Sequence, residues 1–277
     1  MELAVTTDLL VEGRHFLPDA DARALGHKAL AVNLSDLAAC GATPRWITLA
    51  IVLAAPQERW LEAFSSGLFQ LASRYGVELI GGDTTRGPLL TIDITALGEV
   101  PAGAALSRAG AQPGDDIWVS GELGGAALAL LRPEIPEAAK RLHEPEPRVA
   151  LGERLRGLAH AAIDISDGLV GDLGHVLERS RAGARIHYER LPKSRALAKI
   201  ADAQLEKDCV LSGGDDYELL FTAPAHRAGE MARLSNELAL PLTRIGVIEP
   251  AGAQLSILDA AGRLMPFRGG YDHFAPA

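Results

Sequence analysis

The stretch "AAIDISDGL", residues 161–169, decides how the rest of the chain is interpreted. An apolar run ends in two aspartates, Asp164 and Asp167, which bracket a serine, and a glycine then opens a predicted helix. An aspartate between a buried strand and a helix often caps that helix. The alternative is that the two carboxylates hold a cation, and the motif alone leaves both interpretations open.

The composition is typical of a globular protein. The 277 residues are 48% hydrophobic and carry a formal net charge of −9, and this length suits two modest α/β domains or one large one. The acidic balance argues against nucleic-acid binding, and the longest apolar run, residues 47–55, is too short to cross a bilayer. Cys40 and Cys209 form no C-x-x-C motif, which favours a reducing compartment. We therefore expect a cytoplasmic protein that binds neither nucleic acid nor membrane.

Strand and helix patterns alternate along the chain. Residues 90–97 alternate apolar and polar side chains, which predicts a half-buried antiparallel strand. Residues 57–76 carry apolar side chains at helical spacing, and Gly76 is placed to end the helix. A second helical pattern follows residue 168, with Ser166 as its candidate N-cap. These patterns predict an α/β fold with mixed sheets.

Two segments have the composition of connections. Residues 101–116 are rich in Gly, Ala and Pro, and residues 132–148 contain four prolines and mixed charges, typical of an exposed loop with a short helix. The first segment sets the predicted domain boundary. We predict an N-terminal domain over residues 1–100 and a C-terminal domain over residues 101–277.

The acidic junction of residues 161–169 recurs along the chain. An apolar stretch followed by small residues also precedes Asp8, Asp83 and the pair Asp215–Asp216. This pattern predicts carboxylates at the ends of core strands, where α/β sheets bind ligands. Asp36 is expected within a helix, with Asn33 on the same face.

Several converging carboxylates point to cations. One such aspartate alone more often caps a helix or starts a turn, but carboxylates that converge repel one another unless they are neutralised. Hard oxygen donors suit Mg²⁺ or Mn²⁺. Joining a polyphosphate to a second phosphate is the clearest chemistry that needs several such ions. The chain has no P-loop motif, none of its five lysines lies in a glycine-rich turn, and residues 121–127 are a weak glycine signal, so metal ions must supply the positive charge.

Six segments in order give a specific resemblance. The chain resembles thiamine-monophosphate kinase, a family in the superfamily of aminoimidazole ribonucleotide synthetase, selenophosphate synthetase and the hydrogenase-maturation dehydratase. The segments are "TTDLLVEGRHF" (6–16), "KALAVNLSDLAACGATPRW" (28–46), "LIGGDTTRG" (79–87), "AIDISDGLVGDLGH" (162–175), "SGGDDYELLF" (212–221) and "GYDHF" (270–274). The resemblance implies a two-domain α/β fold that dimerises through its N-terminal sheets. It also implies ATP-dependent phosphorylation of thiamine monophosphate to thiamine diphosphate with several Mg²⁺ ions, the N-terminal domain binding metal and ATP.

The resemblance also assigns residues. The implied metal ligands are Thr6, Thr7, Asp8, Asp36, Asp83, Asp164 and Asp167; the implied ATP contacts are Gly82, Asp83, Arg108 and Ser166; and the implied substrate contacts are His15 and Asp216, with Phe267 or Tyr271 as an aromatic wall. No catalytic acid, base or nucleophile is required, because a phosphate monoester with a second pKa near ~6 is largely ionised at neutral pH. We expect direct in-line transfer.

The start of the chain departs from the family pattern. The family has a glycine-rich segment with a further metal aspartate shortly before its "TTD" motif, and only five residues precede Thr6 here. We therefore expect a truncated N-terminal domain that still folds and binds Mg²⁺–ATP more weakly than a longer form. Two alternatives stay open: another ATP-using synthetase of the same superfamily, or a non-catalytic member that binds nucleotides or thiamine phosphates.

Overall fold

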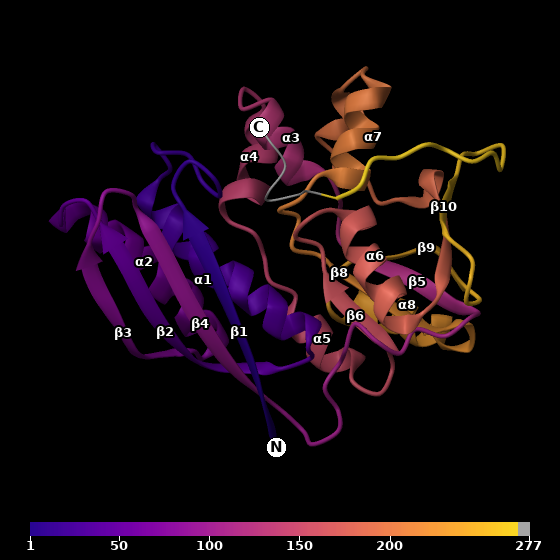
Figure 1. The fold of residues 1–277 in the computed structure, drawn as a ribbon, viewed down its shortest axis with the longest axis horizontal. Helices are drawn as coiled ribbons and strands as arrows, with labels where there is room; N and C mark the ends of the chain where they lie inside the picture. The colour runs from indigo at the N-terminus through magenta and orange to yellow at the C-terminus, as the bar shows by residue number, and fades with distance from the viewer. Residues whose placement is uncertain (271–277) are drawn as a thin grey trace.

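The N-terminal sheet has four strands. The structure is a computed structural model that describes residues 1–270 (Figure 1). The strands are β1 (Glu2–Val11), β2 (Thr43–Leu53), β3 (Glu78–Arg86) and β4 (Thr91–Val100), in the order β1-β4-β2-β3. Strand β4 is antiparallel to both of its neighbours, whereas β3 runs parallel to β2.

The second sheet has six strands and belongs to the C-terminal part of the chain. Its order is β10-β7-β9-β5-β8-β6, and every neighbouring pair is antiparallel except β10 and β7. The strands are β5 (Asp115–Ser120), β6 (Ala161–Asp164), β7 (Gly183–His187), β8 (Leu219–Pro224), β9 (Leu242–Glu249) and β10 (Leu255–Leu258). The mixed α/β fold predicted from the sequence is confirmed.

Helices pack against both sheets (Figure 1). They are α1 (Ala22–Ala39), α2 (Glu58–Tyr75), α3 (Gly125–Leu131), α4 (Pro136–His143), α5 (Val149–Leu155), α6 (Leu169–Ser180), α7 (Ala203–Ser212) and α8 (Ala228–Glu237), with short 3₁₀ turns at Tyr188–Arg190, Leu197–Lys199 and Ala225–Arg227. Within residues 1–270, no helix combines the length and apolar character that a bilayer span requires.

Helix α1 is the central packing element. Leu30 and Leu34 are fully buried, and the same apolar cluster includes Phe221 of the six-stranded sheet. Gly26 lets α1 and α2 pack closely, because a Cβ at this position would lie 2.0 Å from the carbonyl oxygen of Phe64. The two sheets therefore share one core through α1, which fixes where the polar residues of this helix point.

One face of the four-stranded sheet is not covered. On β4, Ile92 and Ile94 are buried toward the helices, as expected from the alternating pattern. On β1, Leu3, Val5 and Leu9 point to the other side and are 55%, 58% and 51% exposed. We call this surface the open face. A sheet face of this apolar character is typical of an interaction surface.

Some local predictions are confirmed and others are wrong. Helix α2 ends at Gly76, which has a left-handed φ of 65°. Ser166 is not the N-cap of α6; Gly168 holds that position, with φ 104° and no side-chain cap. Asp8 and Asp83 lie within strands rather than at strand ends, and Asp215 follows helix α7. The apolar–small–Asp pattern cannot separate these cases, because an edge strand also tolerates a carboxylate in its middle.

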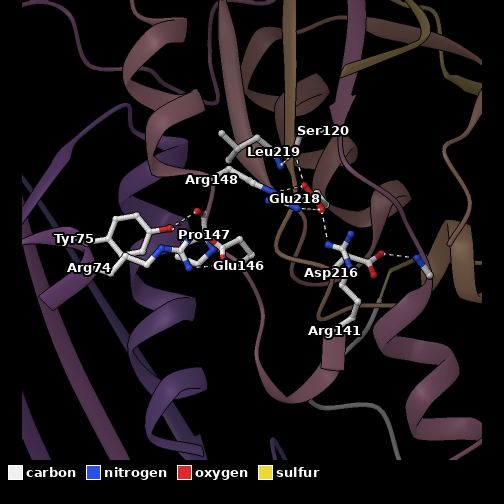
Figure 2. Close-up of polar contacts among 11 residues, drawn as sticks. Arg74, Tyr75, Ser120, Arg141, Glu146, Pro147, Arg148, Asp216, Glu218 and Leu219 are labelled. Atoms are coloured by element: carbon white, nitrogen blue, oxygen red, sulfur yellow. Dashed lines mark hydrogen bonds and ion pairs between the residues drawn. The ribbon is translucent and has the colours of Figure 1, made fainter. Parts of the chain in front are cut away.

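A buried carboxylate anchors the connection between α4 and α5 (Figure 2). Glu218 is completely buried and accepts hydrogen bonds from Ser120 Oγ at 2.6 Å, Arg141 Nη1 at 2.8 Å and Arg148 Nε at 2.7 Å. Two residues before Arg148, Glu146 accepts a hydrogen bond from Tyr75 Oη at 3.0 Å. Glu146 also forms an ion pair with Arg74, the residue before Tyr75 on α2. The segment is thus tied to the N-terminal domain at one end and to the six-stranded sheet at the other.

The Glu218→Gln substitution tests this anchor. We expect it to lower the free energy of unfolding by about 3 kcal/mol, because it leaves the largely buried Arg148 without its counter-charge. Glu237→Gln is the matched control, since Glu237 and Arg154 form a pair in which both side chains are about half exposed, and such pairs contribute less than about 1 kcal/mol. Urea unfolding of the two variants measures the difference, and equal losses would contradict the assignment.

Candidate functional site

A cavity of about 510 Å³ opens between the two domains. Its wall includes Asp8 from β1 and Asp36 from α1, both in the N-terminal domain. The opposite wall comes from the C-terminal domain and includes Arg108, Ser166, Asp167, Asp215 and Tyr217. Five of the residues implied by the resemblance therefore line one cavity, and His15 is a sixth.

The N-terminal wall carries two carboxylates with raised pKa values. Burial, with the neighbouring charges of Asp36 and Asp93, raises the pKa of Asp8 to about 7. Burial also raises the pKa of Asp36, and Thr6 Oγ1 donates a short hydrogen bond to Asp36 Oδ2 that works in the opposite direction. Both acids are thus held where their negative charges are poorly solvated.

Asp164 brings a third carboxylate from the other domain. It ends β6 and is almost completely buried, and it accepts a hydrogen bond from Ser35 Oγ of α1 at 2.7 Å. Burial raises its pKa well above the usual value, and the charge of Asp36 raises it further. Ser35 and Asp36 are consecutive on α1. This helix therefore carries both the hydroxyl that donates a hydrogen bond to Asp164 and the carboxylate whose charge opposes the ionisation of Asp164.

The turn after Asp164 is fixed by backbone hydrogen bonds. The amides of Ser166 and Asp167 both donate to Asp172 Oδ2 at 3.0 Å, and Asp172 belongs to the first turn of α6. Gly168 is required here, because it has φ 104° and a Cβ would approach the carbonyl carbon of Ser212 to 2.8 Å. The turn that presents Ser166 and Asp167 to the cavity is therefore rigid.

Residues 213–217 form the adjoining wall. Asp215 accepts hydrogen bonds from Lys28 Nζ at 2.9 Å and from Tyr217 Oη at 3.0 Å, and its amide donates to Ser166 O at 2.9 Å. Asp215 and Tyr217 have left-handed φ values of 67° and 49°, which are unusual for residues other than glycine. Such strain is typical of functional sites.

Of the two neighbouring aspartates, Asp215 and not Asp216 lines the cavity. Asp216 is buried and accepts a hydrogen bond from the amide of Gly124 at 2.7 Å, and burial raises its pKa to about 8. The sequence shows the doublet but gives no signal for which carboxylate points outward. Sequence reasoning named Asp215 among the acidic junctions without assigning it a contact. It missed Tyr217, which lines the cavity, and Lys28, which donates to Asp215.

Thr7 and Asp83 lie away from the cavity, on the open face. Thr7 Oγ1 shares a hydrogen bond of 2.8 Å with Thr95 Oγ1 of β4. The strand register aligns Asp83 with Ala50, Ala50 with Asp93, and Asp93 with Leu9 in one row. Three inter-strand steps of about 4.8 Å separate β3 from β1, or about 14 Å. Asp83 thus cannot reach the Asp8–Asp36 pair of its own chain.

Gly82 and Phe267 also lie outside the cavity lining. Gly82 has φ 149° on β3, and a Cβ there would lie 1.8 Å from the carbonyl oxygen of Leu49, so the position requires glycine for packing. Phe267 is 37% exposed and does not line the cavity. Tyr271 lies outside the described residues.

The donor set fits magnesium together with a phosphate ligand. In the described part of the chain, no three His, Cys, Asp or Glu side chains are close enough to hold a metal ion by themselves. Mg²⁺ usually takes one or two protein carboxylates and completes its shell with waters and substrate phosphates. Asp8, Asp36 and Asp164 are carboxylates whose pKa values are raised, first of all by burial, and a bound cation would lower these pKa values by favouring the charged forms.

Comparisons with known proteins agree over nearly the whole chain. The family model for AIR synthase related protein, N-terminal domain, matches residues 1–100, and the corresponding C-terminal domain matches residues 112–257. The thiamine-monophosphate kinase of Salmonella typhimurium is 48% identical, over 99% of this chain and 87% of that protein. The thiamine-monophosphate kinase of Aquifex aeolicus is 34% identical, over 90% of this chain and 82% of that protein.

Solved structures give the same result. The crystal structure of thiamine-monophosphate kinase from Stenotrophomonas maltophilia is 49% identical with a TM-score of 0.88, over 92% of this chain and 85% of that chain. AaThiL, solved in complex with AMPPCP and TMP, is 33% identical with a TM-score of 0.85, over 98% of this chain and 87% of that chain. The hydrogenase maturation protein HypE in complex with ATP is 24% identical with a TM-score of 0.81, over 97% of this chain and 85% of that chain, and it shares the fold.

The raised pKa values predict a pH-dependent stabilisation by magnesium. Asp8, Asp36 and Asp164 bind protons more tightly in the folded than in the unfolded chain. Their contribution to stability is therefore present below pH about 4 and is lost as the pH rises through the folded values, about 7 for Asp8. Mg²⁺ binds the deprotonated forms. We expect Mg²⁺ to raise the Tm by about 5 °C at pH 8 and hardly at all at pH 5.

Thermal unfolding in EDTA and in excess Mg²⁺ measures this effect. Potassium chloride at matched ionic strength controls for general screening, and Asp36→Asn is expected to reduce the magnesium increment at pH 8. A magnesium increment of the same size at both pH values would contradict the assignment.

Proposed function

Because the chain belongs to the thiamine-monophosphate kinase family of AIR-synthase-related proteins, we propose that it phosphorylates thiamine monophosphate with ATP, giving thiamine diphosphate and ADP. The observation that carries this proposal is the convergence of carboxylates from both domains on one cavity. The match to AaThiL, solved with AMPPCP and TMP, over 98% of this chain and 87% of that chain, supports the same substrates for this chain.

We assign the metal positions to both walls of the cavity. Asp8 and Asp36 on one side and Asp167 on the other are the cavity-lining carboxylates that would hold Mg²⁺, and Thr6 orients Asp36 through its hydrogen bond. Asp164 does not line the cavity, but the charges of Asp36 and Asp8 act on it, and it would be the fourth carboxylate. Bound Mg²⁺ would screen the two anionic reactants and polarise the transferred phosphoryl group. The rigid turn at Ser166 and Asp167 fixes the positions of these two residues on their own wall.

Phosphoryl transfer then depends on positioning. Arg108 reaches the cavity close enough for its charge to act on Asp36, so its guanidinium is placed to bind phosphate oxygens, and Ser166 lines the same wall. The acceptor phosphate is already ionised and needs no general base. In-line alignment by residues that do not themselves react is the usual mode of phosphoryl-transfer catalysis.

We assign substrate contacts to His15 and Asp215. His15 Nδ1 accepts a hydrogen bond of 3.0 Å from the amide of Val11, so the neutral ring carries its proton on Nε2. Asp215 replaces Asp216 in this role, because Asp215 lines the cavity and Asp216 is buried against Gly124. Lys28 and Tyr217 hold the Asp215 carboxylate in place.

We further propose a homodimer in which the open faces of two copies pack together. The exposed Leu3, Val5 and Leu9 supply an apolar surface for this contact. Asp83 lies about 14 Å from β1 within its own sheet and on the open face. If Asp83 is a metal ligand, as the family pattern implies, it serves the site of the other copy.

A mixing experiment tests the shared site. Asp83→Asn and Asp36→Asn homodimers are each expected to lose activity by orders of magnitude. After co-expression, random pairing makes about half of the dimers heterodimers, each with one intact site if Asp83 crosses over, so about a quarter of wild-type activity returns. Activity that stays at background in verified heterodimers would show that Asp83 acts within its own chain or not at all.

The activity itself is tested by ADP release. We expect release with Mg²⁺, ATP and thiamine monophosphate, and none with thiamine or with other phosphate monoesters. Release with a different acceptor would favour another ATP-using synthetase of the superfamily. Tight binding of thiamine monophosphate without ADP release would favour a non-catalytic binding protein.

We place the reaction in the cytoplasm. Cys40 and Cys209 are both free thiols in the structure, which supports a reducing compartment.

A further inference from the structure

A small apolar recess adjoins the main cavity. Its volume is about 30 Å³, and the two spaces share the lining residues His15 and Leu130. Most of the recess wall is apolar and comes from Phe16, Leu17, Leu25, Leu130 and Leu142. The main cavity is acidic at its other wall, so the combined space changes from charged to apolar along its length.

The charged groups of the recess are already engaged. Lys28 Nζ pairs with Asp215 at 2.9 Å, and the Asp21 carboxylate caps α1 by accepting from the amide of Ala24 at 2.8 Å. Burial, followed by the charge of Lys28, lowers the pKa of His143. The recess thus presents mostly hydrocarbon and the imidazole of His143, while the Lys28 ammonium is paired and the Asp21 carboxylate is hydrogen-bonded to the start of α1.

Leu130 stands where the two spaces meet. It lies near the end of α3 and is 54% exposed, and the next residue, Leu131, is 59% exposed. A single exposed leucine is ordinary. Leu130 differs from Leu131 because it lines both the cavity and the recess, whereas Leu131 lines neither.

We propose that Leu130 packs against the aminopyrimidine ring of the substrate and that the recess receives the methyl group of this ring. The inference rests on the proposed function. Thiamine monophosphate carries its phosphate at one end and its methylpyrimidine at the other. With the phosphate beside the carboxylates and Arg108, the ring reaches the wall formed by His15 and Leu130. A recess of about 30 Å³ has room for one or two water-sized groups, which suits a methyl group and excludes a whole ring.

Leu130→Ala and Leu131→Ala form a matched pair of variants. We expect Leu130→Ala to raise the KM for thiamine monophosphate about tenfold, the factor that corresponds to about 1.4 kcal/mol of lost contact. The kcat and the KM for ATP should stay unchanged, because the contact is made equally in the ground state and the transition state. Leu131→Ala should leave all three parameters at wild-type values.

A substrate analogue without the pyrimidine methyl group tests the recess separately. The wild-type enzyme should bind this analogue more weakly than thiamine monophosphate, and the further substitution Ala24→Leu, which narrows the recess, should affect the natural substrate more than the analogue.

The outcomes separate this inference from the proposed function. A wild-type protein that releases no ADP with thiamine monophosphate would overturn the function. An active wild-type enzyme whose Leu130→Ala and Leu131→Ala variants share one KM, or which binds the analogue as tightly as the natural substrate, would overturn the subsite and leave the function intact.

Discussion

The repulsion between carboxylates that the two domains bring together is the constraint on which this structure depends. Asp36 lies on α1 of the N-terminal domain and Asp164 ends β6 of the C-terminal sheet, yet burial and then the charge of Asp36 raise the pKa of Asp164. Their separation is set by α1, which shares its core with both sheets and carries Ser35, the hydrogen-bond donor to Asp164. The hydrophobic packing of α1 thus keeps the carboxylates of Asp36 and Asp164 near each other despite their repulsion.

The buried carboxylates of this chain differ in whether their hydrogen-bond donors are charged or neutral. Glu218 and Asp164 are comparably buried. Two arginines and a serine hydroxyl donate hydrogen bonds to Glu218 (Figure 2), whereas Asp164 accepts a hydrogen bond from the neutral hydroxyl of Ser35. Permanent counter-charges make a structural anchor. Neutral donors leave negative charge uncompensated, and this is the arrangement that suits a ligand which supplies cations from outside.

Features that depend on residues close together in the sequence could be predicted from it, whereas features that depend on contacts between distant residues could not. The helix end at Gly76 depends on local backbone conformation and could be predicted. The grouping of Asp8 with Asp36 and Asp167 could also be inferred, since several acids with one local pattern suggest a common role. Which of Asp215 and Asp216 faces the cavity depends on the left-handed φ of Asp215 and on the amide of Gly124, and neither is visible in the sequence. The place of Asp83 on the open face depends on strand register, which is set by long-range pairing.

The charge of the cavity also sets the order in which its ligands can enter. Asp8, Asp36 and Asp167 face Arg14 and Arg108, and the carboxylate of Asp215 is engaged by Lys28. A polyphosphate that entered alone would bring its negative charges against these acids, and the two arginines could not compensate for all of them at close range. Cations therefore have to be in the cavity before a phosphate group enters, or have to enter with it. At the opposite end, the recess beside Leu130 is lined mostly by apolar side chains, and its lysine, Lys28, is paired with Asp215. On the proposed function, electrostatic compensation would bind the phosphates, and contact with hydrocarbon that excludes water would bind the ring.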